Sequence, residues 1–120
     1  MLYFLLDLKE MKQPLLPERD LLVLLAILRL REAAYGVSIA REIESTTHRS
    51  VAIAFIYLTL DRLSSQGLVR SWMGDPSPAR GGRAKRCFEV TGKGIRRVRE
   101  TQVALMALWR GLPELEGEQV

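Results

Sequence analysis

Residues 68–91 read LVRSWMGDPSPARGGRAKRCFEVT, and this stretch decides the fold. Its two ends, residues 68–72 and 85–91, are short runs of residue types that favour β-strands. Residues 74–86, which join them, hold two prolines, three glycines and four basic side chains. Proline limits the freedom of a loop, while glycine permits backbone angles that other residues avoid. The stretch therefore predicts a β-hairpin with a stiff, basic tip.

Three helices are predicted ahead of this hairpin. The first begins at Pro17, because proline suits the first position of a helix. The second follows Tyr35, and Ser38 is its expected cap. The third spans residues 51–66 and ends at Gly67, the position typical of the glycine that follows a helix.

One more helix is predicted after the hairpin, over residues 92–112, with Thr91 as its cap and Pro113 at its end. This order predicts a mainly α (α+β) fold, a winged helix-turn-helix with a C-terminal dimerisation helix. The third helix is then placed to enter a major groove of DNA, and the hairpin is the wing. The expected divisions are an N-terminal extension or loose arm (1–16), the winged helix-turn-helix DNA-binding domain (17–91), the dimerisation helix (92–112) and a frayed tail (113–120).

Two apolar surfaces predict a homodimer. The first helix contains LLVLLAILRL (21–30), which is apolar on both faces, and such a helix is buried on two sides. The C-terminal helix repeats its apolar residues at alternating spacings of three and four, the pattern of a two-helix seam. The expected interface residues are Leu24, Ile27, Ile95, Val98, Gln102, Leu105, Trp109 and Leu112.

The positive charge is concentrated in the hairpin and just after it. The chain of 120 residues carries a net charge of +4, yet nine basic and only two acidic residues lie between Arg70 and Arg99. Basic side chains on a glycine-rich loop can displace counterions from phosphates. Double-stranded DNA is therefore the expected partner.

The rest of the composition argues against other classes of protein. The single cysteine, Cys87, allows no disulfide within the chain, which fits a cytoplasmic setting. No arrangement of residues suggests catalysis, a metal site or a cofactor, so the protein is not expected to be an enzyme. The apolar run MLYFLLDL at the N-terminus is too short to cross a membrane and lacks the basic start of a signal peptide.

Three segments resemble the PadR family of bacterial transcriptional regulators: YGVSIAREIE (35–44), IYLTLDRLSSQGLVRS (56–71) and GDPSPARGGRAKRCFEVTGKG (74–94). The resemblance runs from about residue 21 to residue 112 and is greatest to the short members with a single C-terminal helix. It implies a homodimer that represses a promoter and that often responds to a small molecule, here expected to be hydrophobic.

The resemblance also assigns residues to DNA. Tyr57 matches a family tyrosine that lies near the phosphates, and Gly82, Arg83 and Lys85 match the wing. The full set of candidate DNA-binding residues is Tyr35, Ser50, Ala54, Tyr57, Leu58, Arg62, Arg80, Gly82, Arg83 and Lys85.

The predicted recognition helix departs from the family pattern where it would meet the bases. It begins VAIAF (51–55), so Phe55 occupies a position where a small side chain is usual, and Leu58 replaces a threonine or proline. Alanine and phenylalanine can touch thymine methyl groups but make no hydrogen bonds to base edges. An alternative function follows, a winged-helix protein–protein interaction module without specific DNA binding, because exposed apolar patches often mark protein contacts.

Overall fold

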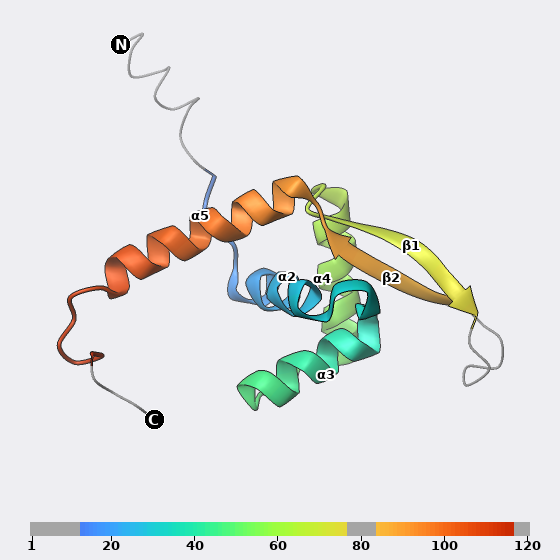
Figure 1. Ribbon diagram of the computed structural model, residues 1–120, viewed down its shortest axis with the longest axis horizontal. Helices are drawn as coiled ribbons and strands as arrows, with labels where there is room; N and C mark the ends of the chain where they lie inside the picture. Colours follow the sequence, from blue (N-terminus) through green and yellow to red (C-terminus); the bar gives the residue numbers. More distant parts are fainter. Residues whose placement is uncertain (1–12, 77–83, 117–120) are drawn as a thin grey trace, which may run out of the picture.

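The computed structural model describes residues 13–76 and 84–116. In Figure 1 the helices that precede the hairpin are grouped together, the hairpin projects from them, and the final helix lies along one side. The fold is mainly helical with a two-stranded wing, which confirms the predicted class. The elements in order are α2 (Glu18–Leu30), the 3₁₀ turn η1 (Arg31–Ala33), α3 (Gly36–Thr47), α4 (Ile53–Ser65), β1 (Val69–Pro76), β2 (Ala84–Val90) and α5 (Gly92–Trp109).

One hydrophobic core holds α2, α3, α4 and the hairpin together. Each helix contributes its apolar stripe, and Phe88 of β2 fills the space beneath them. Close packing of such side chains is the main stabilising contribution in a domain of this size. The side chains with the least exposed surface are Leu24, Ile27, Ile39, Ile56, Leu60, Leu63, Leu68 and Phe88.

The end of α4 is fixed by a glycine, as the sequence predicts. Gly67 has a φ of 75°, in the left-handed region that only glycine adopts readily. Its N–H donates to the carbonyl of Ser64 at 3.0 Å, and the N–H of Leu68 donates to that of Leu63 at 2.9 Å. These two bonds form a Schellman motif. The chain therefore leaves α4 in the direction that begins β1.

The hairpin is tied to the start of α3. β1 and β2 pair antiparallel from Val69 opposite Val90 to Met73 opposite Arg86. On its other edge, β2 forms a bridge between Cys87 and Tyr35, and the N–H of Phe88 donates to the carbonyl of Ala34 at 2.9 Å. This bridge was not predicted, because one residue leaves no strand pattern in the sequence.

Ser38 and α5 differ from the predicted helix ends. Ser38 is not the N-cap residue of α3, which is Tyr35, but it takes part in a capping box from the first turn, where its Oγ accepts from the N–H of Tyr35 at 2.9 Å. The prediction of Thr91 as the cap of α5 is confirmed, since its Oγ1 accepts from the N–H of Gly94. However, α5 ends at Trp109 and not at residue 112, because Arg110 is already extended and Gly111 has a φ of 77°.

Residues 13–16 are not a loose arm. Leu16 belongs to the core, and its N–H donates to the buried Thr101 Oγ1 of α5 at 3.1 Å. The Arg97 guanidinium donates to Gln13 Oε1 at 2.6 Å and to the carbonyl of Pro14 at 2.8 Å. This segment therefore attaches α5 to the start of α2, while residues 1–12 of the predicted extension lie outside the described part.

Candidate nucleic-acid interface

The helix α4 has one packed side and one outward side. Ile56, Leu60 and Leu63 are fully buried against α2 and α3. Because a helix turns about 100° per residue, the side chains of Ala54 and Leu58 lie on the opposite side, one turn apart. Leu58 is 62% exposed, the largest value among the large apolar side chains of this helix.

Phe55 lies beside this outward surface and is contacted by a cation. Its ring is 47% exposed, and the Arg19 guanidinium carbon from α2 lies 5.3 Å from the ring centroid. A cation over an aromatic face is attracted by the electrons of the ring. Arg19 therefore places a positive charge directly next to the apolar surface of α4.

Tyr57 packs against the first residue of α3. A Cβ built on Gly36 would overlap the hydroxyl and the ring of Tyr57, so only glycine leaves room for this tyrosine. Tyr57 remains 44% exposed, and its hydroxyl has no hydrogen-bond partner among residues 13–76 and 84–116. The hydroxyl can therefore donate to an outside acceptor.

Lys85 connects the hairpin to the start of α3, where Gly36 packs against Tyr57. Its Nζ lies 4.4 Å from the centroid of the Tyr35 ring, and Tyr35 directly precedes Gly36. A continuous set of contacts therefore runs from Lys85 at the start of β2, through Tyr35 and Gly36, to Tyr57 on α4. This set fixes the position of the hairpin relative to the outward side of α4.

Arg62 is held by a carboxylate that the sequence did not reveal as its partner. Its Nη2 donates to Oδ1 of Asp20, which is almost completely buried, while Arg62 itself is 41% exposed. Asp20 lies in the first turn of α2, where a negative charge also interacts favourably with the helix dipole. The predicted DNA contact of Arg62 would thus have to be made by a guanidinium that already bridges α2 and α4.

Of the remaining predicted DNA residues, the structure describes only Ser50. Ser50 is exposed just before α4, and its Oγ donates to Glu44 Oε2 at 3.2 Å. Arg80, Gly82 and Arg83 lie outside the described residues, so their assignment to DNA stays a prediction.

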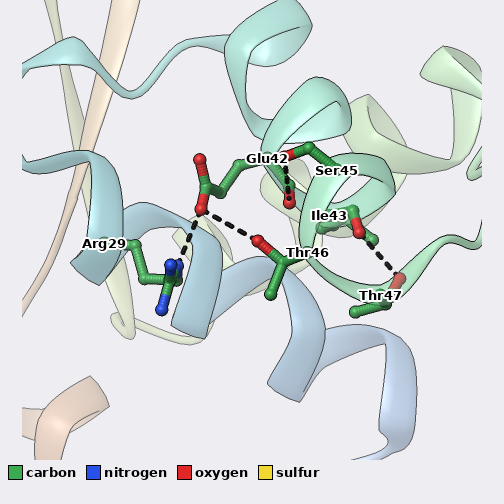
Figure 2. Close-up of polar contacts among 6 residues, drawn as sticks. All are labelled: Arg29, Glu42, Ile43, Ser45, Thr46 and Thr47. Atoms are coloured by element: carbon green, nitrogen blue, oxygen red, sulfur yellow. Dashed lines mark hydrogen bonds and ion pairs between the residues drawn. The ribbon is translucent and has the colours of Figure 1, made fainter.

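An exposed ion pair fixes α3 against α2 (Figure 2). Arg29 Nε donates to Glu42 Oε2 at 2.7 Å, and Thr46 Oγ1 donates to the same oxygen at 3.1 Å. The hydrogen bond from Arg29 lowers the pKa of the Glu42 carboxyl from its ordinary value of 4.5. The pair orients the first helix of the helix-turn-helix, which in turn supports α4.

The apolar surface between α2 and α5 corrects part of the predicted interface. Leu24 and Ile27 are 0% and 2% exposed within one chain, so a second chain has almost nothing left to cover there. The sequence could not distinguish the two apolar faces of α2, and the prediction chose residues of the face that packs on α3 and α4. Leu21 and Leu25 are the α2 residues that face α5 instead.

A pocket of about 250 Å³ lies between these two helices. It includes four of the residues predicted for the interface and one that the spacing missed, Met106. Its lining residues are Leu21, Leu25, Val98, Gln102, Leu105, Met106 and Trp109.

Two other predicted interface residues lie elsewhere. Ile95 lines a separate pocket of about 280 Å³, which also contains Trp72 of β1. Leu112 follows the end of α5 and therefore does not continue the helical seam. The predicted stripe is thus shorter at both ends than the spacing suggested.

Two further observations concern the part of the chain that the structure describes. Within it, histidine, cysteine and acidic side chains form no group able to hold a metal ion. None of its helices combines the length and apolar character needed to cross a membrane.

Comparisons with known proteins agree with this geometry. The model of the transcriptional regulator PadR-like family matches residues 24–100, and regulators of that family bind DNA. No curated protein matches the chain.

Several solved structures are similar to most of the chain. A PadR family transcriptional regulator from Eggerthella lenta is 25% identical, with a TM-score of 0.63 and coverage of 98% of this chain and 92% of that one. A PadR family regulator from Clostridium difficile is 23% identical, with a TM-score of 0.63 and coverage of 84% and 100%. A PadR-like regulator from Bacillus cereus is 18% identical, with a TM-score of 0.66 and coverage of 83% and 92%.

Proposed function

This chain belongs to the PadR-like family of transcriptional regulators, and we propose that it acts as a homodimer that binds a specific operator and represses transcription. The observation that carries the proposal is the joined surface of α4 and the start of β2, which runs from Leu58 and Tyr57 through Tyr35 to Lys85. Regulators are not enzymes, and no catalytic step is part of the proposal.

In this proposal, α4 enters the major groove and the hairpin follows the phosphate backbone. The free hydroxyl of Tyr57 donates to a phosphate, and the basic residues of the wing displace counterions. Arg80, Arg83 and Lys85 supply most of this sequence-independent affinity. Ser50 and Ala54 contact the groove at the start of α4.

The dimer is supported by the exposed apolar side chains of α5. Leu105, Met106 and Trp109 remain exposed beside Leu25 of α2, although side chains of this size are normally covered. Figure 1 shows that the C-terminal half of α5 extends beyond the grouped helices, where a second chain can reach it. A two-fold axis through this seam would present two α4 helices to half-sites about one DNA turn apart.

The pocket between α2 and α5 is the proposed place for a hydrophobic small-molecule effector. Its lining is apolar apart from Gln102, and a dimer would enclose it further. A ligand there would change the seam that sets the distance between the two recognition helices. Such a change would relieve repression.

The direct test is binding to the promoter of its own gene. The purified protein should bind an inverted repeat there as a dimer, and affinity should fall with salt at a slope of about 0.9 per phosphate contact. Arg83→Ala should reduce that slope by about one unit for operator and random DNA alike. Arg110→Ala removes the same charge at the end of α5 and should leave the slope unchanged.

A winged-helix protein–protein interaction module is the second candidate function. The exposed Phe55 and Leu58 favour it. Such a module would show no preference for any promoter sequence, and Arg83→Ala and Arg110→Ala would weaken its residual DNA binding equally.

A further inference from the structure

We propose that α4 recognises its operator through the C5-methyl groups of thymines, with Leu58 and Phe55 as the specificity-determining residues. This inference rests on the proposed DNA binding and specifies what the helix reads. It predicts half-sites with thymines at the positions that face α4, in place of the guanines that arginine side chains usually select.

The first argument is the chemistry of the exposed surface in the first two turns of α4. Its exposed side chains there are Ile53, Ala54, Phe55, Tyr57 and Leu58. Only Tyr57 carries a hydrogen-bonding group, and the one other polar side chain in these turns, Thr59, is buried. This part of the helix therefore cannot read bases through hydrogen bonds, except through one hydroxyl.

The second argument is the electrostatic setting of that surface. Arg19 lies over the Phe55 ring, Arg49 is exposed shortly before α4, and Lys85 lies over Tyr35 beside it. An apolar patch with cations around it is complementary to a groove whose rims are phosphates and whose floor holds methyl groups. A purely apolar protein partner would leave these cations without compensating charge.

The third argument is that the helix that carries these apolar side chains is fixed in place before DNA arrives. Leu58 projects from a helix whose opposite side is fully packed, and Phe55 is held from one side by Arg19. Little conformational entropy is then lost when they contact a base edge. Among the bases, only thymine presents an apolar group in the major groove.

The test removes the methyl groups and nothing else. The full-length protein is first used to select bound duplexes from a random library, which yields a preferred site. Each thymine of that site is then replaced by deoxyuridine, which pairs identically but lacks the C5-methyl, and Kd is measured at fixed salt. We expect about a fourfold loss of affinity for each contacted methyl.

A matched variant assigns the effect to the helix. At the thymine that Leu58 contacts, Leu58→Ala should bind the thymine site about as weakly as the wild type binds the site with uracil at that position, and uracil there should weaken the variant no further. Alanine suits an exposed helix position, so the variant should keep its circular dichroism and melting temperature. Met73→Ala, at an equally exposed apolar side chain on β1, should keep the full sensitivity to uracil.

The possible outcomes distinguish thymine readout from the proposed DNA-binding function on which it rests. A specific site whose affinity is unchanged by uracil would overturn thymine readout and leave the regulator intact. If uracil reduced the affinity of the wild type and of Leu58→Ala equally at every thymine of the site, the inference would also be overturned, since no methyl would then be read by Leu58. A protein that selects no sequence at all would overturn both proposals and favour a protein partner for α4.

Discussion

Helices α4 and α5 both expose large apolar side chains, but they do so against very different backgrounds. In α4 the opposite side is fully packed, with Ile56, Leu60 and Leu63 buried. The exposed residues of α4 are therefore not needed to form the core. In α5 the only buried residues are Gly94 and Thr101, and most of its apolar side chains remain exposed.

The difference shows how an exposed apolar residue should be interpreted. A residue on a helix that is already well packed can be available for recognition without cost to folding. A helix that has almost no buried side chains gains little from its own chain and needs a second surface to be stable. Substitutions should therefore have their largest effect on α5 and smaller effects within the packed helices.

The largest effect is expected from the double variant Leu105→Glu with Trp109→Glu, which tests the role of α5. Both side chains line the α2–α5 pocket, and glutamates there would place like charges across a dimer seam. We expect a loss of about 3 kcal/mol or more in dimer stability, over a hundredfold in Kd, together with loss of operator binding. Sedimentation velocity would measure the mass of the species in solution.

Val103→Glu is the matched control for this double variant. Val103 is exposed on the other side of α5, next to Arg96 and Arg99, so the same kind of change should leave the dimer intact. A double variant that still sediments as a well-folded dimer would contradict the role given to α5.

The next largest effect, on the stability of the fold, is expected from Arg62→Ala in α4. The change would leave the buried carboxylate of Asp20 without its ion pair. Loss of one partner of a buried pair costs about 3–5 kcal/mol, and because Arg62 is partly exposed we expect about 2–3 kcal/mol in urea unfolding. The matched control is Arg29→Ala, whose pair with Glu42 is exposed and whose loss should change stability much less.

Gly36→Ala tests the contact between α3 and α4. The new methyl would overlap the Tyr57 ring, and we expect a cost of about 1–3 kcal/mol in stability together with weaker DNA binding. The same change at Gly92 meets only the end of the Arg96 side chain, at 3.8 Å, and should be close to neutral. If adding Tyr57→Ala failed to recover part of the stability lost in Gly36→Ala, the overlap would not be the cause.

The smallest expected effect is that of Glu42→Gln, which removes the charge between α2 and α3. The pKa of Glu42 is lowered in the folded state, so its ion pair with Arg29 stabilises the fold above the unfolded pKa near 4.5. That contribution is lost as pH falls through the lower, folded pKa. The melting temperature of the variant should lie slightly below that of the wild type at pH 7, and the gap should close under acid conditions. If the difference in melting temperature persisted under acid conditions, it would have a cause other than the charge of Glu42.

The sequence by itself determined the order of the elements and their main boundaries. Gly67 ends α4 because only glycine adopts the required φ readily, and Thr91 caps α5 because its hydroxyl accepts a local N–H. These signals act within one turn of the chain, so they can be read without knowing the neighbours. The family followed from short segments of the same kind, and the match over residues 24–100 confirms it.

Only the tertiary structure decided which faces meet. Leu24 and Leu25 are equivalent in the sequence, yet one is buried in the core and the other is exposed towards α5, because the position of α3 and α4 selects the covered face. The pairs Asp20–Arg62 and Tyr57–Gly36 join residues far apart in the chain, and no local pattern reports such distances. Periodicity predicts that a helix has an apolar side, but the packing of the other elements determines which residues of that side remain exposed.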